Sequence, residues 1–476
     1  MGTIHSELLV VGAGSGGFAA ALSAARAGIE VYLVEISSHL GGNANRCGVN
    51  NWESVVGATG YPFEIYRALK ARSAVGIYSY GRHCLWNGYD VIPGGEHRID
   101  DNYRYVDTLR RHGLRSLRED EDFARRVLHG VSFEPDAYEQ VLYELLEETR
   151  NCEILYNTGI TEVETDAGRV VAVGLPDGRK IEANYYVDGT GDGDLCAAAG
   201  CEVMIGQESA NRFGEPSASP EPNDRINGVT LMYRVTRAAN PSTEEIPDDV
   251  PNACWWRDAF PAAAFFEFPS GDWSVNMLPT MEGREYLEME SEAAYEECRR
   301  RVLAHWHSVQ TNYPEYRELR IRSMSEAVGV RESRRIVGEH VLTEIDVVTE
   351  FREGYHEDTI AIADHALDRH GDKGGAHEVD DPFSIPYRCL IPKGFTNLLI
   401  ACRAASFSSI AASSCRLSRT MMQLGQAAGN AVAIASESGS PLPTVSATRL
   451  RNRLVEQNVQ LDFPLDPDLE SYLRSE

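Results

Sequence analysis

The sequence predicts an α/β protein in which a Rossmann-like domain, made of a parallel sheet and an antiparallel meander, contains an inserted α+β domain. A strand, a glycine turn and an alanine-rich helix occupy residues 7–35, and a strand followed by a small-residue helix returns near residue 400. Both features suit one parallel sheet, so the chain between them holds an insertion. The expected boundaries are 1–204 plus 380–476 for the first domain and 205–379 for the second, with a smaller insertion at 75–135.

The first unit predicts a strand, a tight turn and a helix. Leu8–Val11 is wholly apolar, as in a strand buried on both faces of a parallel sheet. Gly12 permits a sharp turn, Gly14 lets a pyrophosphate approach the backbone, and Gly17 lets the helix pack closely on the sheet. The complete turn consists of Gly12, Ala13, Gly14, Ser15, Gly16 and Gly17.

The second strand of this unit ends on an acid, because Glu35 directly follows the apolar run Val31–Val34. An acid at this place can accept hydrogen bonds from a ribose diol, and it argues against a ribose 2′-phosphate. The unit therefore predicts a dinucleotide site for FAD or NAD. An ordinary glycine-rich turn between a strand and a helix is the alternative.

Charge and composition limit the classes of partner that the protein can bind. The 476 residues include 72 acidic and 45 basic ones, and the formal net charge of −27 repels nucleic acid and anionic membrane surfaces. The sequence shows neither a membrane-spanning apolar run nor a signal-peptide pattern at its N-terminus. We therefore expect a cytoplasmic, enzyme-sized protein with neither a nucleic-acid nor a membrane partner, and a homo-oligomer stays open.

The ten cysteines form no metal-binding pattern. They include no C-x-x-C pair and no cluster with histidine, so their spacing fits neither a zinc site nor an iron-sulfur cluster. We expect mostly buried thiols in a reducing compartment, and no bound metal.

A glycine and asparagine loop follows Glu35. Gly41 and Gly42 permit close backbone approach, while Asn43 and Asn45 offer both donors and acceptors. A plain NAD domain would continue with a helix, so this loop favours a place beside the polar edge of a flavin. An ordinary surface turn is the alternative.

Residues 153–188 change from helical to strand-like periodicity and predict a small antiparallel meander. A second glycine turn follows, in which Gly191 and Asp192 lie between Asp188 and Asp194. Acids so close together could bind a metal. The glycines favour a turn that faces a cofactor, with Asp192 accepting from a ribityl hydroxyl or a bridging water. The predicted meander strands are 154–156, 161–165, 169–173 and 180–183.

The middle of the chain has strands and a helix of its own. Residues 205–225 are rich in Pro, Ser, Asn and Gly and predict a linker or mobile loop. The block that follows is predicted to form the substrate domain. Its strands are expected at 229–235, 264–268 and 273–277 and its helix at 290–309; elsewhere, helices are expected at 62–71, 135–150 and 420–436 and a final strand at 395–403.

Together these segments resemble a known family. Gly12–Glu35, Val187–Asp194 and Asn397–Gly429 are similar to the FAD-dependent oxidoreductases of the glutathione-reductase-like superfamily, which are related to fumarate-reductase-type flavoproteins. The stretches 328–338, 385–388 and 414–422 resemble the subfamily labelled only "FAD-dependent oxidoreductase". The similarity covers most of the chain and is weakest over about 75–135 and 240–320. No second glycine motif for NAD(P)H is visible.

The resemblance implies an FAD-binding domain at 1–204 plus 380–476. It places the pyrophosphate at Gly12–Gly17, the adenosine ribose at Glu35 and an adenine contact near Val163. It also places Asp192 near the ribityl chain or the phosphates, and Gly41–Asn45 near the isoalloxazine together with Arg403 and Arg416. The family usually has Ala-Gly-Arg where this chain has Ala401-Cys402-Arg403, so backbone approach to the flavin is expected to differ there.

Several residues are candidates for catalysis. His370 or Tyr387 could take a hydroxyl proton, and Arg331, Arg334 or Arg388 could bind a substrate carboxylate. Structural roles are the alternative: the arginines at 331–335 could form an ion-pair network with Glu332, and His370 could lie in a solvated loop.

The leading prediction is a flavin dehydrogenase or oxidase that takes a hydride from a small polar substrate, such as an alcohol, sugar or hydroxy acid, and passes electrons to an unidentified acceptor. The alternatives are a C–C desaturase or fumarate-type reductase, a monooxygenase, and an FAD-binding subunit that only transfers electrons.

Overall fold

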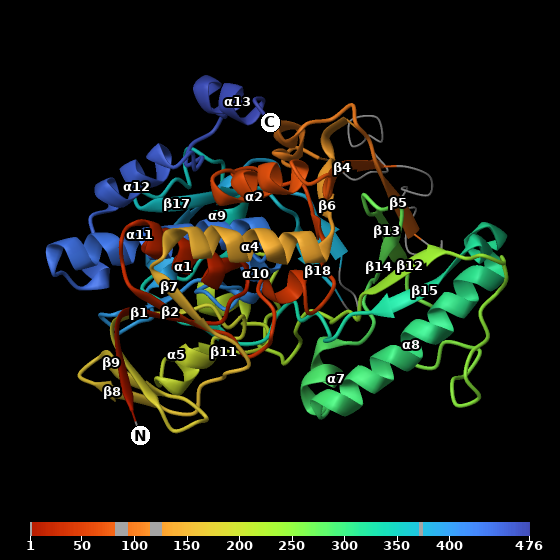
Figure 1. Ribbon diagram of the computed structural model, residues 1–476, viewed down its shortest axis with the longest axis horizontal. Helices are drawn as coiled ribbons and strands as arrows, with labels where there is room; N and C mark the ends of the chain where they lie inside the picture. The colour runs from red at the N-terminus through yellow and green to blue at the C-terminus, as the bar shows by residue number, and fades with distance from the viewer. Residues whose placement is uncertain (1, 81–93, 115–125, 371–374) are drawn as a thin grey trace.

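The computed structural model describes residues 2–80, 94–114, 126–370 and 375–476, and it has two main sheets (Figure 1). The first sheet has the strand order β7-β2-β1-β10-β9-β8, with β21 also paired to β10. Its bounds are β1 Thr3–Val11, β2 Val31–Val34, β7 Cys152–Leu155, β8 Val163–Asp166, β9 Arg169–Gly174, β10 Lys180–Asp188 and β21 Leu398–Ile400.

Strand β10 joins the parallel sheet to the meander. It is parallel to β1 along nearly its whole length, antiparallel to β9 through Lys180 and Ile181, and parallel to β21 through Tyr186–Asp188. The strand predicted at 180–183 therefore continues as one strand to Asp188. The prediction for 154–156 was wrong in its partner, since β7 pairs in parallel with β2 and extends the parallel sheet. A short apolar run gives no indication of which strand it pairs with.

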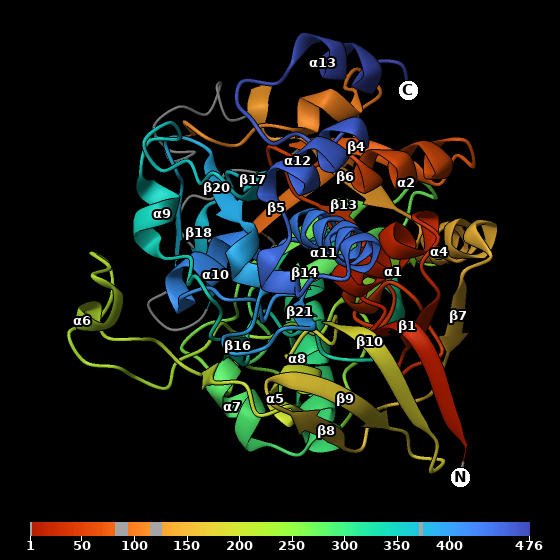
Figure 2. The same cartoon turned by 90° about the vertical axis from the view of Figure 1, so that its left-hand side faces the viewer.

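Two helices pack against each other on this sheet with almost no space between them. They are α1 Ser15–Arg26 and α11 Ser418–Ser438, which lie side by side in Figure 2. A Cβ at Gly425 would lie 2.0 Å from the carbonyl oxygen of Gly16, and one at Gly429 would lie 2.3 Å from that of Ala20. Small residues thus let α11 hold the start of α1 against the sheet.

The second sheet has the strand order β15-β12-β14-β13-β5-β4-β6-β3. It combines strands from residues 51–133 with strands from 233–324, so the predicted insertion at 75–135 and the predicted domain at 205–379 share one sheet. The division into domains stays a prediction. The bounds are β3 Asn51–Trp52, β4 Val75–Tyr80, β5 Gly94–Ile99, β6 Gly130–Phe133, β12 Tyr233–Arg237, β13 Ala263–Glu267, β14 Trp273–Met277 and β15 Leu319–Met324.

A long helix, α8 Ser291–Asn312, covers one side of this sheet (Figure 1). Its Cys298, Val302 and Trp306 are buried and share a core with Phe265 and Val275 of the strands. The predicted helix at 290–309 is therefore a packing element of the second sheet.

The remaining elements connect and cover the two sheets, and they include a short helix inside the stretch expected to be a linker. They are α2 Tyr61–Lys70, α4 Pro135–Thr149, α5 Asp194–Ala198, β11 Val203–Met204, α6 Ala210–Phe213, α7 Gly283–Glu288, β16 Arg335–Ile336, α9 Glu344–Val348, β17 Thr359–Ala363, β18 Leu367–Arg369, β19 Gly375–His377, β20 Phe383–Pro386, α10 Ser409–Cys415, α12 Ala447–Glu456 and α13 Pro467–Leu473.

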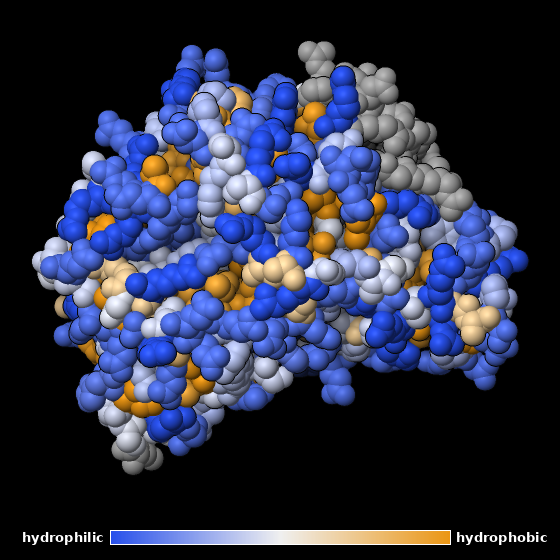
Figure 3. Space-filling view, turned by 45° about the horizontal axis from the view of Figure 1, so that its top comes forward, coloured by the Kyte–Doolittle hydropathy of each residue, from blue (hydrophilic) through white to orange (hydrophobic). Residues whose placement is uncertain are grey.

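The face of the molecule shown in Figure 3 is mostly hydrophilic, with hydrophobic side chains in small separate groups. Within the described ranges, no helix combines the length and the apolar character needed to cross a membrane.

Candidate active site

The glycine turn between β1 and α1 is shaped for a ligand at one position. A Cβ at Gly12 would lie 2.6 Å from the carbonyl carbon of Gly189, and one at Gly17 would lie 1.8 Å from the carbonyl oxygen of Gly12, so packing within the protein requires both glycines. A Cβ at Gly14 would meet nothing closer than 3.8 Å. Gly14 is also the N-cap of α1 and supplies no side-chain cap, which leaves the amide end of the helix open to an anion.

Two neighbouring features complete this cradle. The 41–45 loop packs on the glycine turn, because a Cβ at Gly42 would lie 2.9 Å from the Cα of Gly14. In the same loop, the Asn45 side chain donates to the carbonyl oxygen of Leu40, and its own Oδ1 is buried without a protein partner among the described residues. Ser15 is the first residue of α1, and Gly16 packs on Ala401, whose carbonyl oxygen would lie 1.7 Å from a Cβ at that position.

Glu35 is buried at the end of β2 and holds the turn in place. One carboxylate oxygen accepts the Ala13 N–H at 2.8 Å, and the other accepts the Ser37 N–H at 2.9 Å and the Ser37 hydroxyl at 2.7 Å. The oxygen that accepts from Ala13 has a lone pair to spare, so the same carboxylate can accept from a ribose hydroxyl. Two backbone N–H groups, one side-chain hydroxyl and a ribose hydroxyl would then share one fixed carboxylate.

Changing Glu35 to Gln is expected to weaken FAD binding by about 10- to 100-fold, because charge-assisted hydrogen bonds contribute about 1.5–3 kcal/mol and an amide nitrogen would face N–H donors. The measurement is FAD retention and Kd by fluorescence titration of the apoprotein. Glu30→Gln, on an exposed acid just before β2, is the matched control. Equal Kd values for the two variants would contradict the assigned role.

The second glycine turn brings Asp192 to Arg403. An Arg403 guanidinium nitrogen donates to Asp192 Oδ1 at 2.6 Å, and the Ser333 hydroxyl donates to the same oxygen. Burial alone would raise the pKa of Asp192, but the Arg403 charge and these hydrogen bonds hold it below its ordinary value. Gly191 has φ of +90°, and a Cβ there would lie 2.6 Å from an Arg403 guanidinium nitrogen, so this close approach requires glycine.

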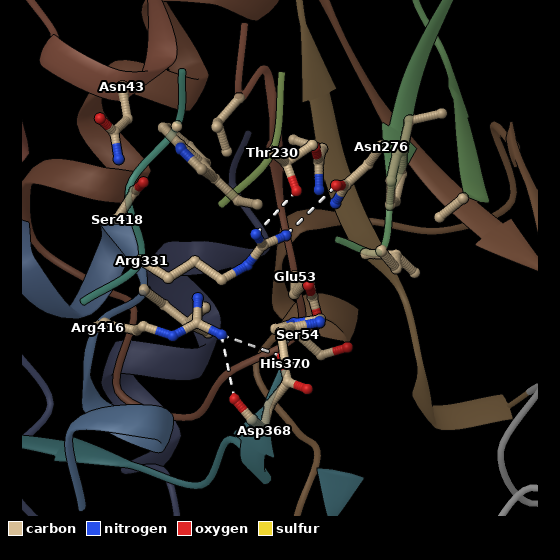
Figure 4. A pocket seen from close by; sticks show the side chains of 18 of the residues that line it. Asn43, Glu53, Ser54, Thr230, Asn276, Arg331, Asp368, His370, Arg416 and Ser418 are labelled. Atoms are coloured by element: carbon tan, nitrogen blue, oxygen red, sulfur yellow. Dashed lines mark hydrogen bonds and ion pairs between the residues drawn. The ribbon is translucent and has the colours of Figure 1, made fainter. Parts of the chain in front are cut away.

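Arg403 also lines a cavity of about 460 Å³. The other walls of this cavity come from the second sheet and from the segments that connect the strands (Figure 4). Five of the residues that the sequence analysis singled out line it, although they come from distant parts of the chain: Asn43, Arg331, His370, Arg403 and Arg416. Trp52, Thr230, Phe266 and Asn276 contribute walls from the second sheet and its connections.

His370 forms a mostly buried chain of contacts at one side of this cavity. Its Nε2 lies 2.6 Å from Asp368 Oδ2, and Arg416 donates to the same carboxylate oxygen at 3.1 Å. Burial lowers the pKa of His370, an effect that the charge of Arg331 adds to and that of Asp368 opposes. Asp368 is held ionised, because His370 and Arg416 lower its pKa more than burial raises it. A neutral His370 that donates through Nε2 keeps a lone pair on Nδ1. His370 therefore does not lie in a solvated loop.

Arg331 brings a partly buried positive charge to the same cavity. Its guanidinium donates to the carbonyl oxygen of Gly228 and the hydroxyl of Thr230, both at 2.8 Å, and lies 3.4 Å from Asn276 Oδ1. In the described parts of the chain no carboxylate forms an ion pair with it. Burial, followed by the charge of Arg416, lowers the pKa of Arg331 to about 10.

The ion-pair network expected for residues 331–335 exists, but it excludes Arg331. Arg335 pairs with Glu332 and Glu208 in the interior, and Arg334 pairs with Asp194. Arg331 points instead toward Thr230 and Asn276, beside Arg416 (Figure 4). A partly buried cation of this kind is suited to an anionic ligand.

Two predicted catalytic residues lie away from the cavity, and their catalytic role stays a prediction. The Tyr387 side chain is buried, and its hydroxyl donates to the carbonyl oxygen of Leu442 at 3.1 Å. Arg388 is half exposed and pairs with Asp358 at 3.0 Å. Neither is among the described residues that line the cavity. Both follow β20 closely in sequence, and their neighbours gave no sign of which way this segment faces.

Val163 lies on β8, paired with Val173, and is half-buried. Its adenine contact stays a prediction that follows from the resemblance.

Sequence reasoning missed a second charged group on the cavity wall. Glu53 accepts from Arg111 at 3.0 Å and lies 3.1 Å from His365 Nε2, and these contacts lower its pKa although burial would raise it. Arg111 also pairs with Glu378 at 2.7 Å. Each residue lies in a different segment, so no local motif could have indicated the group.

This geometry fits FAD, since the open position at Gly14, the free start of α1 and the anchored Glu35 match the needs of a dinucleotide. Residues 7–454 match the model of the family described as FAD dependent oxidoreductase. The chain therefore belongs to this family, and the resemblance, the fold class and the FAD cofactor predicted from the sequence are confirmed.

Solved structures of similar fold include enzymes of several activities. A geranylgeranyl bacteriochlorophyll reductase-like protein from Thermoplasma acidophilum is 13% identical, with a TM-score of 0.46 over 100% of this chain and 97% of its own. p-Nitrophenol 4-monooxygenase from Pseudomonas putida DLL-E4 is 14% identical, with a TM-score of 0.41 over 100% of this chain and 93% of its own. L-proline dehydrogenase from P. horikoshii is 12% identical, with a TM-score of 0.39 over 95% of this chain and 99% of its own. No match was found among the curated protein sequences.

Proposed function

We propose that this FAD-dependent oxidoreductase oxidises the CH–OH group of a small hydroxy acid. The observation that carries the proposal is Arg331, a partly buried guanidinium in the cavity without a carboxylate partner among the described residues. A substrate carboxylate would supply the missing negative charge through charge-assisted hydrogen bonds. Among alcohols, sugars and hydroxy acids, only the last class carries that charge.

His370 is the proposed base. With Nε2 held by Asp368, its Nδ1 accepts the proton of the substrate hydroxyl as the C–O bond becomes a carbonyl. Asp368 fixes the tautomer and, with Arg416, the position of the ring. FAD supplies the two-electron acceptor for the hydrogen that leaves carbon as hydride. The products are a keto acid and one proton on His370, so atoms and electrons balance.

Anaerobic mixing of the FAD-loaded protein with matched pairs of substrates tests this proposal. Each pair has one carbon skeleton, such as lactate with propane-1,2-diol or glycerate with glycerol. The hydroxy acid is expected to bleach the flavin at least about tenfold faster than its neutral partner at equal concentration, because one charged hydrogen bond contributes about 1.5–3 kcal/mol.

Two results would overturn the proposal. Equal bleaching by the neutral partners would show that no carboxylate is recognised. Failure of every hydroxy acid, together with reoxidation of the chemically reduced protein by an unsaturated acid such as fumarate, would establish the reductase alternative.

A further inference from the structure

Two histidines and an aspartate meet outside the cavity described above. His340 lies between β16 and α9, Asp346 lies in the first turns of α9, and His356 precedes β17. Their side chains are 25%, 18% and 17% exposed, so the group is mostly buried but open to small ions. None of the three is among the described residues that line the cavity.

The three side chains turn their metal-binding atoms toward one point. Asp346 Oδ1 lies 3.2 Å from His356 Nε2 and 3.7 Å from His340 Nε2, and all the ligand atoms lie within 4.8 Å of one another. Bonds of about 2.0–2.2 Å to a tetrahedral ion would separate its ligands by about 3.4 Å. The two distances to Asp346 Oδ1 are therefore close to those around a coordinated ion, and the two histidine nitrogens lie within 4.8 Å of each other.

Hydrogen bonding within the protein satisfies only part of this group, in which His356 Nε2 and Asp346 Oδ1 form a hydrogen bond at 3.2 Å. Asp346 Oδ2 is occupied by the N–H and hydroxyl of Thr343, both at 2.8 Å, which fixes the carboxylate with Oδ1 toward the histidines. The Nε2 of His340 is buried, and the described residues offer it no hydrogen-bond partner. By holding Oδ2, Thr343 orients the carboxylate so that its other oxygen can bind an ion, as the hydrogen-bond partners of metal ligands commonly do.

We propose that His340, Asp346 and His356 bind Zn²⁺ through two imidazole nitrogens and one carboxylate oxygen. Imidazole and carboxylate are ligands that suit this ion, and three protein ligands leave a fourth position for water. The ion would join the loop before α9, α9 itself and the loop before β17. The proposal departs from the expectation of no metal, which depended on cysteine spacing and could not detect histidines brought together by folding.

The test compares metal content in the FAD-loaded protein and its variants. Each protein is stripped with a chelator, dialysed against Zn²⁺, and measured for zinc per chain and for Kd. His340→Gln removes a ligand whose Nε2 has no hydrogen bond to lose. The matched control is His5→Gln, because His5 lies 3.4 Å from Glu182 as an exposed pair without a third ligand.

The wild type and the His5 variant are expected to hold one more Zn²⁺ per chain than the His340 variant. In the His340 variant the Kd for Zn²⁺ at this site should rise at least about tenfold. Zn²⁺ should also slow amide hydrogen exchange around residues 340–358 in the first two proteins. Equal zinc content in all three, or unchanged exchange in the wild type, would overturn the proposal. His356→Gln gives a second removal of a ligand should the His340 variant fail to fold.

Discussion

Flavin reduction by a hydroxy acid is expected to slow by about 10²- to 10⁴-fold when His370 is changed to Gln, which is the usual range for loss of a positioned general base. Glutamine can still occupy the space beside Asp368, but it cannot accept a proton at neutral pH. The measurement is the anaerobic reduction rate at saturating substrate in a stopped-flow spectrometer. His307→Gln is the matched control, because His307 lies on α8 and does not line the cavity.

The pH dependence distinguishes a base from a structural histidine. The base must be neutral to act, and burial lowers the pKa of His370 below its ordinary value of 6.5. The wild-type rate is therefore expected to be level around neutral pH and to be lost only as the pH falls through the lowered pKa. This acidic limb should disappear in the His370 variant. A limb that persists in the variant would assign the titration to another group.

The cofactor half of the site was predictable because it depends on neighbours in sequence. Gly12, Gly14 and Gly17 each have a requirement that follows from a strand, a turn and a helix in succession, and Glu35 ends the next strand. The structure adds where the packing constraint lies, since Gly425 on α11 is needed as much as the glycines of the turn. That requirement comes from a helix far along the chain.

The substrate half was predictable only in part, because it depends on pairings between distant segments. Arg331 and Arg335 look equivalent in sequence, yet Arg335 is enclosed by Glu332 and Glu208 whereas Arg331 faces the cavity. Both His370 and Tyr387 were candidates for the base, but of the two only His370 lines the cavity. No local pattern contains that information.

Arg331→Met is expected to raise the KM for a hydroxy acid by about 10²- to 10³-fold, since it removes one or two charge-assisted hydrogen bonds of about 1.5–3 kcal/mol each. Methionine keeps much of the side-chain volume but not the charge. Steady-state kinetics with the matched hydroxy acid and diol provide the comparison, and the KM for the diol should change little. Arg322→Met is the control, because Arg322 is 58% exposed on β15, away from the cavity.

Lysine at position 331 separates charge from geometry. Arg331 reaches Gly228, Thr230 and Asn276 with a planar guanidinium, and an ammonium group cannot reproduce both edges of that fork. Arg331→Lys should therefore keep the preference for the acid over the diol while recovering only part of the lost affinity. Equal losses for acid and diol in the methionine variant, with FAD content unchanged, would mean that Arg331 supports the cavity wall and that the substrate carboxylate binds elsewhere.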